Sequence, residues 1–131
     1  PVFAFGKGEL METIDLSLKD YHMVLVKPNR GVSTPEAYRG ITPRAASFDL
    51  RELGKLPVEQ WSGVIVNDFE DSVIPKVPEI EEIKNKLRDL GAIYVSMTGS
   101  GSAVYGLFHH PVEAEKAFSE YFVWQSEGMS L

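Results

Sequence analysis

The sequence contains no cysteine, so disulfides, thiolate metal sites and thiol catalysis are all excluded. It also lacks a long hydrophobic run, because stretches such as 23–26 and 63–66 are far shorter than the roughly 20 residues that a membrane-spanning helix needs. The missing cysteine suits a reducing compartment. We therefore expect a cytoplasmic protein that has no membrane partner.

Basic residues are in short supply. The chain has 13 Lys and Arg against 19 Asp and Glu, which gives a formal net charge of -6. Proteins that bind nucleic acid without reading its sequence need clustered Lys and Arg to neutralise phosphates. We therefore expect no nucleic-acid partner, and any anionic ligand has to be held by local groups.

What the chain does contain is typical of one globular domain. Its 131 residues are close to the commonest domain size, and 44% of them are hydrophobic and 24% charged. There is no internal repeat and no long linker. We therefore expect a single domain over residues 1–131 with one hydrophobic core.

Apolar runs separated by turn residues predict both strands and helices. The predicted extended segments are 2–5, 9–18, 21–27, 92–97, 103–108 and 121–125. The predicted helices are 35–39, 78–90 and 111–120. From residue 78 onward the order is helix, strand, strand, helix, strand. That order predicts an α+β fold, with helices packed on one face of a mainly antiparallel sheet.

Two of these helices carry end signals. Thr34 can cap the helix 35–39, with Pro35 in its first turn and Gly40 closing it. In the helix 78–90 an apolar stripe runs up to Gly91, which supplies the C-cap. The stripe consists of Ile80, Ile83, Leu87 and Leu90.

The central region, 49–74, is predicted to be helical, with breaks at Gly54, Pro57 and Pro75. Its β-branched run at 64–66 leaves a strand as the alternative there.

The most distinctive motif is the glycine-rich stretch at 98–108, TGSGSAVYGLF. It is not a Walker A loop, because no lysine follows the glycines, and it is not a dinucleotide-binding loop, because the residues after it resemble a strand. A plain turn between two strands is the simpler interpretation. Gly99 and Gly101 permit positive φ, however, so successive N–H groups could also form an anion-binding nest.

Two polar clusters resemble metal sites only weakly. His109 and His110 are adjacent, whereas a site on a helix needs ligands three or four residues apart. Asp68, Glu70 and Asp71 could bind Mg²⁺ through oxygen, but such a cluster is more often a solvated helix edge. We therefore predict no metal site in this chain.

No catalytic group stands out from the sequence alone, since the chain has neither a nucleophile elbow nor a Ser/His/Asp set. Tyr38 lies on the short helix 35–39. It could offer its ring to a ligand, but the pattern alone favours a place in the core.

Four blocks, in this order and at these intervals, resemble the C-terminal domain of the GHMP small-molecule kinases. They are 6–10 (GKGEL), 27–38 (KPNRGVSTPEAY), 67–70 (NDFE) and 98–108 (TGSGSAVYGLF). Each block is short, but together they span nearly the whole chain. The second is similar to that of the members that act on a cytidine-diphosphate-linked methylerythritol in non-mevalonate isoprenoid biosynthesis.

This resemblance implies a ferredoxin-like fold and a second half outside this chain. In the family an N-terminal domain binds ATP and carries the catalytic groups, so residues 1–20 would form the junction with that missing domain. ATP and Mg²⁺ would serve the full-length kinase, while this chain alone would bind neither, hold no catalytic residue and be inactive. The apolar face left by the missing domain would cause weak self-association.

The resemblance also implies which residues contact the substrate, a small molecule that carries a cytidine diphosphate group. Tyr38 matches the aromatic position that stacks on cytosine, and Thr34 and Pro35 match the adjoining pocket wall. The residues implied to line the cleft between the two domains are Thr98, Gly99, Ser100, Gly101 and Ser102.

Two alternatives stay open. The chain could be half of another GHMP kinase, acting on homoserine, mevalonate or a sugar, although the block 27–38 points toward a cytidine-bearing substrate. It could also be a free-standing regulatory or ligand-binding domain of ferredoxin-like build.

Overall fold

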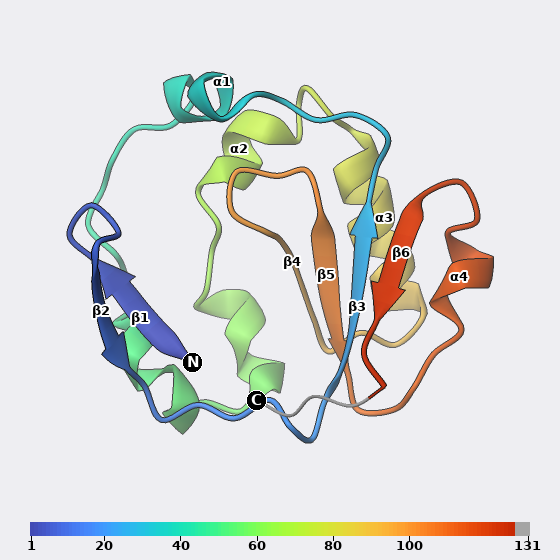
Figure 1. The fold of residues 1–131 in the computed structure, drawn as a ribbon, viewed down its shortest axis with the longest axis horizontal. Coiled ribbons are helices and arrows are strands. Elements are labelled where there is room, and N and C mark those ends of the chain that lie inside the picture. The colour runs from blue at the N-terminus through green and yellow to red at the C-terminus, as the bar shows by residue number, and fades with distance from the viewer. Residues whose placement is uncertain (128–131) are drawn as a thin grey trace.

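The centre of the molecule is a four-stranded antiparallel sheet (Figure 1). We describe residues 1–127 of a computed structural model of the chain. The strands lie in the order β4-β5-β3-β6, and each neighbouring pair is antiparallel. Their bounds are β3 (His22–Lys27), β4 (Tyr94–Met97), β5 (Val104–Phe108) and β6 (Phe122–Gln125).

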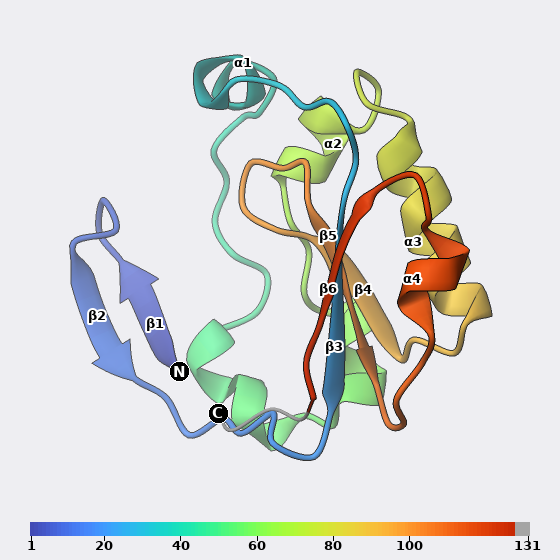
Figure 2. The same ribbon diagram turned by 45° about the vertical axis from the view of Figure 1, so that its right-hand side comes forward.

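Two helices, α3 (Glu79–Asp89) and α4 (Ala114–Ala117), lie on one side of this sheet (Figure 2). The order β3-α3-β4-β5-α4-β6, together with the order of the strands, is that of a ferredoxin-like fold. The predicted α+β architecture is therefore confirmed. Helix α4 is shorter than the predicted segment 111–120, because the backbone leaves helical geometry at Phe118, with φ -124° and ψ 46°.

Helix α3 is held by its apolar stripe. Ile80, Ile83 and Leu87 are buried between the helix and the sheet. Gly91 follows with a φ of 103° and donates its N–H to the carbonyl of Arg88 at 2.9 Å, which ends the helix where the sequence predicts. No helix within residues 1–127 is long and apolar enough to cross a membrane.

The opposite face of the sheet is covered in part by a 3-10 helix, η2 (Val58–Gly63). Trp61 of this helix packs edge-on against Tyr94, with ring centroids 5.5 Å apart, and donates its indole N–H to the carbonyl of Leu56 at 3.1 Å. Leu107 of β5 is buried in the same layer. The sheet therefore divides the expected core into two layers.

The break predicted at Gly54 is wrong. The 3-10 helix η1 (Leu50–Lys55) runs through this residue. A Cβ added to Gly54 would lie 1.7 Å from the carbonyl oxygen of Asp15, so glycine is required here for a close backbone approach. The break predicted at Pro57 is confirmed, since this residue precedes η2.

The run 64–66 forms neither a helix nor a strand. It connects η2 to helix α2 (Phe69–Val73), and Ile65 packs against the layer around Trp61. Tertiary packing of one side chain thus outweighs the local β preference. Helix α2 ends before Pro75, as predicted.

Helix α1 (Thr34–Arg39) begins one residue earlier than predicted. Ser33, rather than Thr34, is the N-cap, and its hydroxyl oxygen accepts a hydrogen bond from the N–H of Glu36 at 3.3 Å. Both residues carry a capping hydroxyl, so only the backbone geometry of the turn selects between them. The helix closes at Gly40, as predicted.

An N-terminal hairpin stands apart from the main sheet in both views (Figures 1 and 2). It consists of β1 (Val2–Phe5) and β2 (Leu10–Thr13), which is shorter than the predicted segment 9–18. Its turn places Gly6 and Gly8 at positive φ. Large apolar side chains along the hairpin remain exposed, namely Val2, Phe5, Leu10 and Met11.

Candidate functional site

The glycine-rich motif forms the connection between β4 and β5. The N–H of Thr98 donates to the carbonyl of Ala103 at 2.8 Å, and the N–H of Gly101 donates to the carbonyl of Thr98 at 2.9 Å. Gly99 and Gly101 have φ values of 47° and 90°, in the region that glycine tolerates without strain. The motif is therefore a strand connection, as the simpler interpretation has it.

The loop also leaves two donors free. Within residues 1–127, the backbone N–H groups of Gly99 and Ser100 have no hydrogen-bond acceptor. Neighbouring free N–H groups in a glycine turn can bind an anion or another backbone. The turn and the nest interpretations are thus compatible.

A cleft of about 630 Å³ lies beside this loop. Thr98 and Gly99 of the loop line it, and so do Tyr38 and Phe69. The structure therefore brings together an aromatic residue and part of the glycine loop that are far apart in the sequence.

Tyr38 is a surface residue rather than the core residue that the pattern alone favours. Its side chain is 58% exposed. The ring of Phe69 packs against it almost perpendicularly, at 85° and with centroids 4.8 Å apart. Such a contact fixes the ring while leaving much of its surface open.

The other predicted site residues lie outside this cleft. Thr34 and Pro35 are exposed on the same helix as Tyr38 but do not line the cleft. Ser100, Gly101 and Ser102 likewise do not line it.

Two of these loop residues have packing roles instead. A Cβ added to Gly101 would lie 2.9 Å from the sulfur of Met97, and a Cβ added to Gly31 would lie 3.1 Å from the hydroxyl of Ser102. Ser102 is itself buried. The far side of the loop thus packs tightly on its surroundings, and only its near side faces the cleft.

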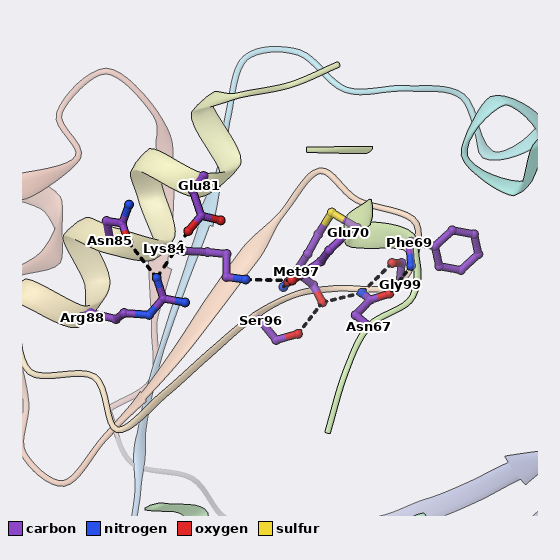
Figure 3. Close-up of polar contacts among 10 residues, drawn as sticks. All are labelled: Asn67, Phe69, Glu70, Glu81, Lys84, Asn85, Arg88, Ser96, Met97 and Gly99. Carbon is purple, nitrogen blue, oxygen red and sulfur yellow. Dashed lines mark hydrogen bonds and ion pairs between the residues drawn. The ribbon is translucent and has the colours of Figure 1, made fainter. Parts of the chain in front are cut away.

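Asn67 holds the loop from below (Figure 3). Its Nδ2 donates to the carbonyls of Met97 and Gly99, at 2.8 and 2.9 Å, and its Oδ1 accepts from the N–H of Phe69 at 3.0 Å. Every polar atom of this side chain is therefore engaged, with the amide nitrogen on the carbonyls on either side of Thr98 and the amide oxygen on the first residue of helix α2.

Glu70 and Lys84 complete the network in Figure 3. One carboxylate oxygen of Glu70 accepts from the N–H of Met97 at 2.8 Å, and the other lies 2.7 Å from the ammonium nitrogen of Lys84. The side chains of Lys84 and Glu70 are only 10% and 17% exposed. In an ion pair with so little solvent around it, loss of one charge would leave the other buried and uncompensated.

Sequence reasoning missed this network. The sequence groups Glu70 with Asp68 and Asp71, as a solvated helix edge or, less commonly, a Mg²⁺ site, and gives no sign of a contact with the loop. In the structure Glu70 turns toward Lys84, while Asp68 pairs with Arg44 at 2.6 Å. In the part of the chain that the structure describes, no three His, Asp or Glu side chains gather so as to hold a metal ion.

Hydroxyl groups make up part of the cleft wall beneath the loop. Tyr94, Ser96 and Tyr105 line the cleft together. Burial raises the pKa of Tyr105, and the nearby Tyr94 raises it further through its charge and a hydrogen bond. Burial also raises the pKa of Tyr94, although hydrogen bonds with Ser96 and Tyr105 oppose this rise. Both phenols are therefore protonated at neutral pH.

His109 and His110 lie outside the cleft. The Nε2 of His109 is 2.6 Å from a carboxylate oxygen of Glu59, and its ring packs against Tyr21. This surface contact joins η2 to the end of β5.

A family model and curated proteins match this chain. The family described as GHMP kinases C terminal matches residues 43–122. The 4-diphosphocytidyl-2-C-methyl-D-erythritol kinase of Parabacteroides distasonis is 50% identical over 129 residues, which cover 97% of this chain and 48% of that kinase. The Bacteroides fragilis enzyme of the same name is 46% identical over 128 residues, covering 97% of this chain and 47% of that enzyme.

Solved structures agree as well. The crystal structure of a 4-(cytidine 5'-diphospho)-2C-methyl-D-erythritol kinase superposes with a TM-score of 0.74 at 26% identity, over 95% of this chain and 48% of that one. A homoserine kinase from Cytophaga hutchinsonii has the same fold, with a TM-score of 0.66 at 17% identity, over 97% of this chain and 48% of that one. The chain spans about half the length of the curated relatives it matches. The resemblance carried by the four blocks is thus confirmed, and the chain belongs to the GHMP kinase family, whose C-terminal domain it matches.

Proposed function

We propose that this chain is the substrate-binding half of an ATP-dependent kinase. The whole protein would transfer the γ-phosphoryl group of ATP to the 2-hydroxyl of 4-diphosphocytidyl-2-C-methyl-D-erythritol, a step of non-mevalonate isoprenoid biosynthesis. The names of relatives up to 50% identical support this assignment. The absence of cysteine supports a cytoplasmic location.

One observation carries the proposal for the substrate. An exposed tyrosine ring, that of Tyr38, lies in one cleft with the glycine loop. Stacking of a nucleobase on an aromatic side chain contributes about 1 to 3 kcal/mol, and any base can use it. A ring fixed from one side by Phe69 suits a cytosine better than it suits a small aliphatic substrate such as homoserine.

The groups that act on ATP would come from the missing N-terminal half. In the family that the chain resembles, the N-terminal domain binds ATP and carries the catalytic groups, and this chain spans only about half the length of its relatives. We therefore assign no catalytic residue to this chain. Phosphoryl transfer depends mainly on positioning and charge stabilisation, and this half would contribute the positioning of the substrate.

The hairpin β1–β2 supports the proposed junction at residues 1–20. Its apolar side chains are exposed although the hairpin is well formed. Phe5 and Leu10 are paired on one face, and Val2 and Met11 lie on the other, so both faces of the hairpin expose apolar side chains. Exposed apolar surface commonly marks an interface. We propose that it packs on the N-terminal half of the full-length kinase, and that Thr34, Pro35 and the loop 98–102 contact ligand only when both halves enclose it.

A kinase assay tests the function. This chain, joined to the N-terminal half of the Parabacteroides distasonis relative, should phosphorylate 4-diphosphocytidyl-2-C-methyl-D-erythritol in preference to homoserine, whereas the 131-residue chain alone should transfer no phosphate. Preference for homoserine would contradict the proposed substrate. Phosphate transfer by the 131-residue chain alone would contradict the assignment of the catalytic groups to the N-terminal half.

Matched variants in the same assay test the role of Tyr38. Tyr38→Ala should raise KM for the cytidine substrate about tenfold, because it removes the stacking surface. Tyr38→Phe keeps that surface and should leave KM nearly unchanged. Equal KM values for the two variants would contradict a stacking role.

A further inference from the structure

One short segment, 67–70, contacts both the glycine loop and the ring of Tyr38, which line the same cleft. We propose that Asn67 and Glu70 are positioning residues, which hold the glycine loop 98–102 at a fixed place relative to the ring of Tyr38. Their importance for catalysis rests on the function proposed above. Their hold on the loop does not, and it is open to a separate test.

The first step is the amide of Asn67. It donates to the carbonyls on either side of Thr98 and accepts from the N–H of Phe69, the first residue of helix α2. Only a side-chain amide has two donors and an acceptor on one short planar group. Aspartate has the same shape but no donor, and it would set its charge against the two carbonyl oxygens.

The second step is the link from this segment to the aromatic wall. The N–H of Phe69 is fixed by Asn67, and the ring of Phe69 packs on Tyr38. The positions of the loop and of the aromatic ring thus both depend on the backbone of the segment 67–70. A shift of the segment 67–70 would change the distance between them.

The third step is the carboxylate of Glu70, which fixes the end of β4 just before the loop. It accepts the N–H of Met97 while Lys84, from helix α3, neutralises it. Hydrogen bonds to a charged acceptor are stronger than neutral ones. Because the pair is largely buried, removal of either partner alone would leave an uncompensated charge.

Hydrogen exchange in the 131-residue chain tests the hold on the loop. The N–H of Gly101, which closes the turn on Thr98, should exchange roughly fivefold faster or more in Asn67→Asp, while the amides of the central strand β3 keep their rates. As a control, Glu81→Gln removes an exposed ion pair with Arg88 and should change neither. Unchanged exchange at Gly101, or an equal rise in β3, would overturn the proposal.

Two double variants address Glu70 without leaving a buried charge. Glu70→Gln with Lys84→Met retains an oxygen that can accept the N–H of Met97, whereas Glu70→Ala with Lys84→Met retains none. The glutamine version should preserve slow exchange at Gly101, and the alanine version should lose it. If the two behave alike, Glu70 has no positioning role.

Kinetics of the two-domain protein test the consequence for catalysis. Asn67→Asp leaves the ring of Tyr38 in place, so kcat should fall about ten- to a hundredfold while KM for the cytidine substrate changes about twofold or less. A rise in KM with kcat unchanged would overturn the catalytic part. If the parent protein itself does not act on this substrate, the proposed function fails, and hydrogen exchange still decides whether the segment positions the loop.

Discussion

At the scale of single residues, the phenols beneath the cleft link stability to pH. The usual pKa of a tyrosine is 10.0, and burial raises that of Tyr105 in the folded chain. The folded state therefore keeps its proton at a pH where the unfolded state has lost it. Stability from this source is fully present below pH 10.0 and is lost as the pH rises through the folded pKa.

We expect the free energy of unfolding to fall above this pH, and Tyr105→Phe to lessen the fall. Denaturant unfolding of the parent and the variant at a series of alkaline pH values measures the fall in the free energy of unfolding. Tyr38→Phe, which changes an exposed phenol, serves as the control and should follow the parent curve. A parent-like alkaline loss in Tyr105→Phe would contradict the assignment.

The residues of the site differ in how far the sequence could reveal them. Tyr38 was placed in the core by pattern alone, because helical spacing cannot tell an exposed aromatic residue from a buried one. Only the family resemblance placed it in a site. Asn67 and Glu70 could not be connected with the loop, because their partners Met97 and Gly99 lie about 30 positions away and are backbone atoms, which carry no signal of their own.

At the scale of elements, the loop between β4 and β5 has a strict requirement for glycine at one position. Gly101 combines a φ of 90° with close packing on Met97 and Val73. Any side chain there meets both a backbone conformation that L residues rarely adopt and occupied space.

Gly101→Ala should therefore lower the free energy of unfolding by about 1 to 3 kcal/mol. Gly63→Ala is the matched control, since a Cβ added there meets no atom within 4 Å. Its effect should stay within about 0.5 kcal/mol. Thermal or denaturant unfolding of both variants gives the comparison, and equal losses would show that the loop is not constrained as described.

The elements themselves were largely predictable from sequence where a pattern is strong and long. Helix α3 follows its apolar stripe, and β3, β4 and β5 follow their short, mainly apolar runs. The prediction was wrong at Gly54 and at 64–66. In both places a contact with a distant segment determines the backbone conformation, and such contacts cannot be predicted from local propensity.

At the scale of the whole molecule, the exposed hairpin predicts weak self-association. Met11 is 65% exposed, on the same face of the hairpin as the exposed Val2 of β1. We expect sedimentation of the 131-residue chain to show association that increases with concentration and is reduced in Met11→Lys. Phe122→Lys alters an equally exposed residue on β6 and should not reduce it. A strict monomer at high concentration would contradict the prediction.

The pairing of the strands also sets the order in which the molecule can be made. Strand β3 ends at Lys27, yet both of its partners, β5 and β6, come from the last third of these 131 residues. Until the ribosome has passed residue 108, β3 has neither neighbour and presents two open edges. While residues 28–103 are synthesised, these edges are open to pairing with other chains, and the cleft, which β4 and β5 help to line, is assembled only afterwards.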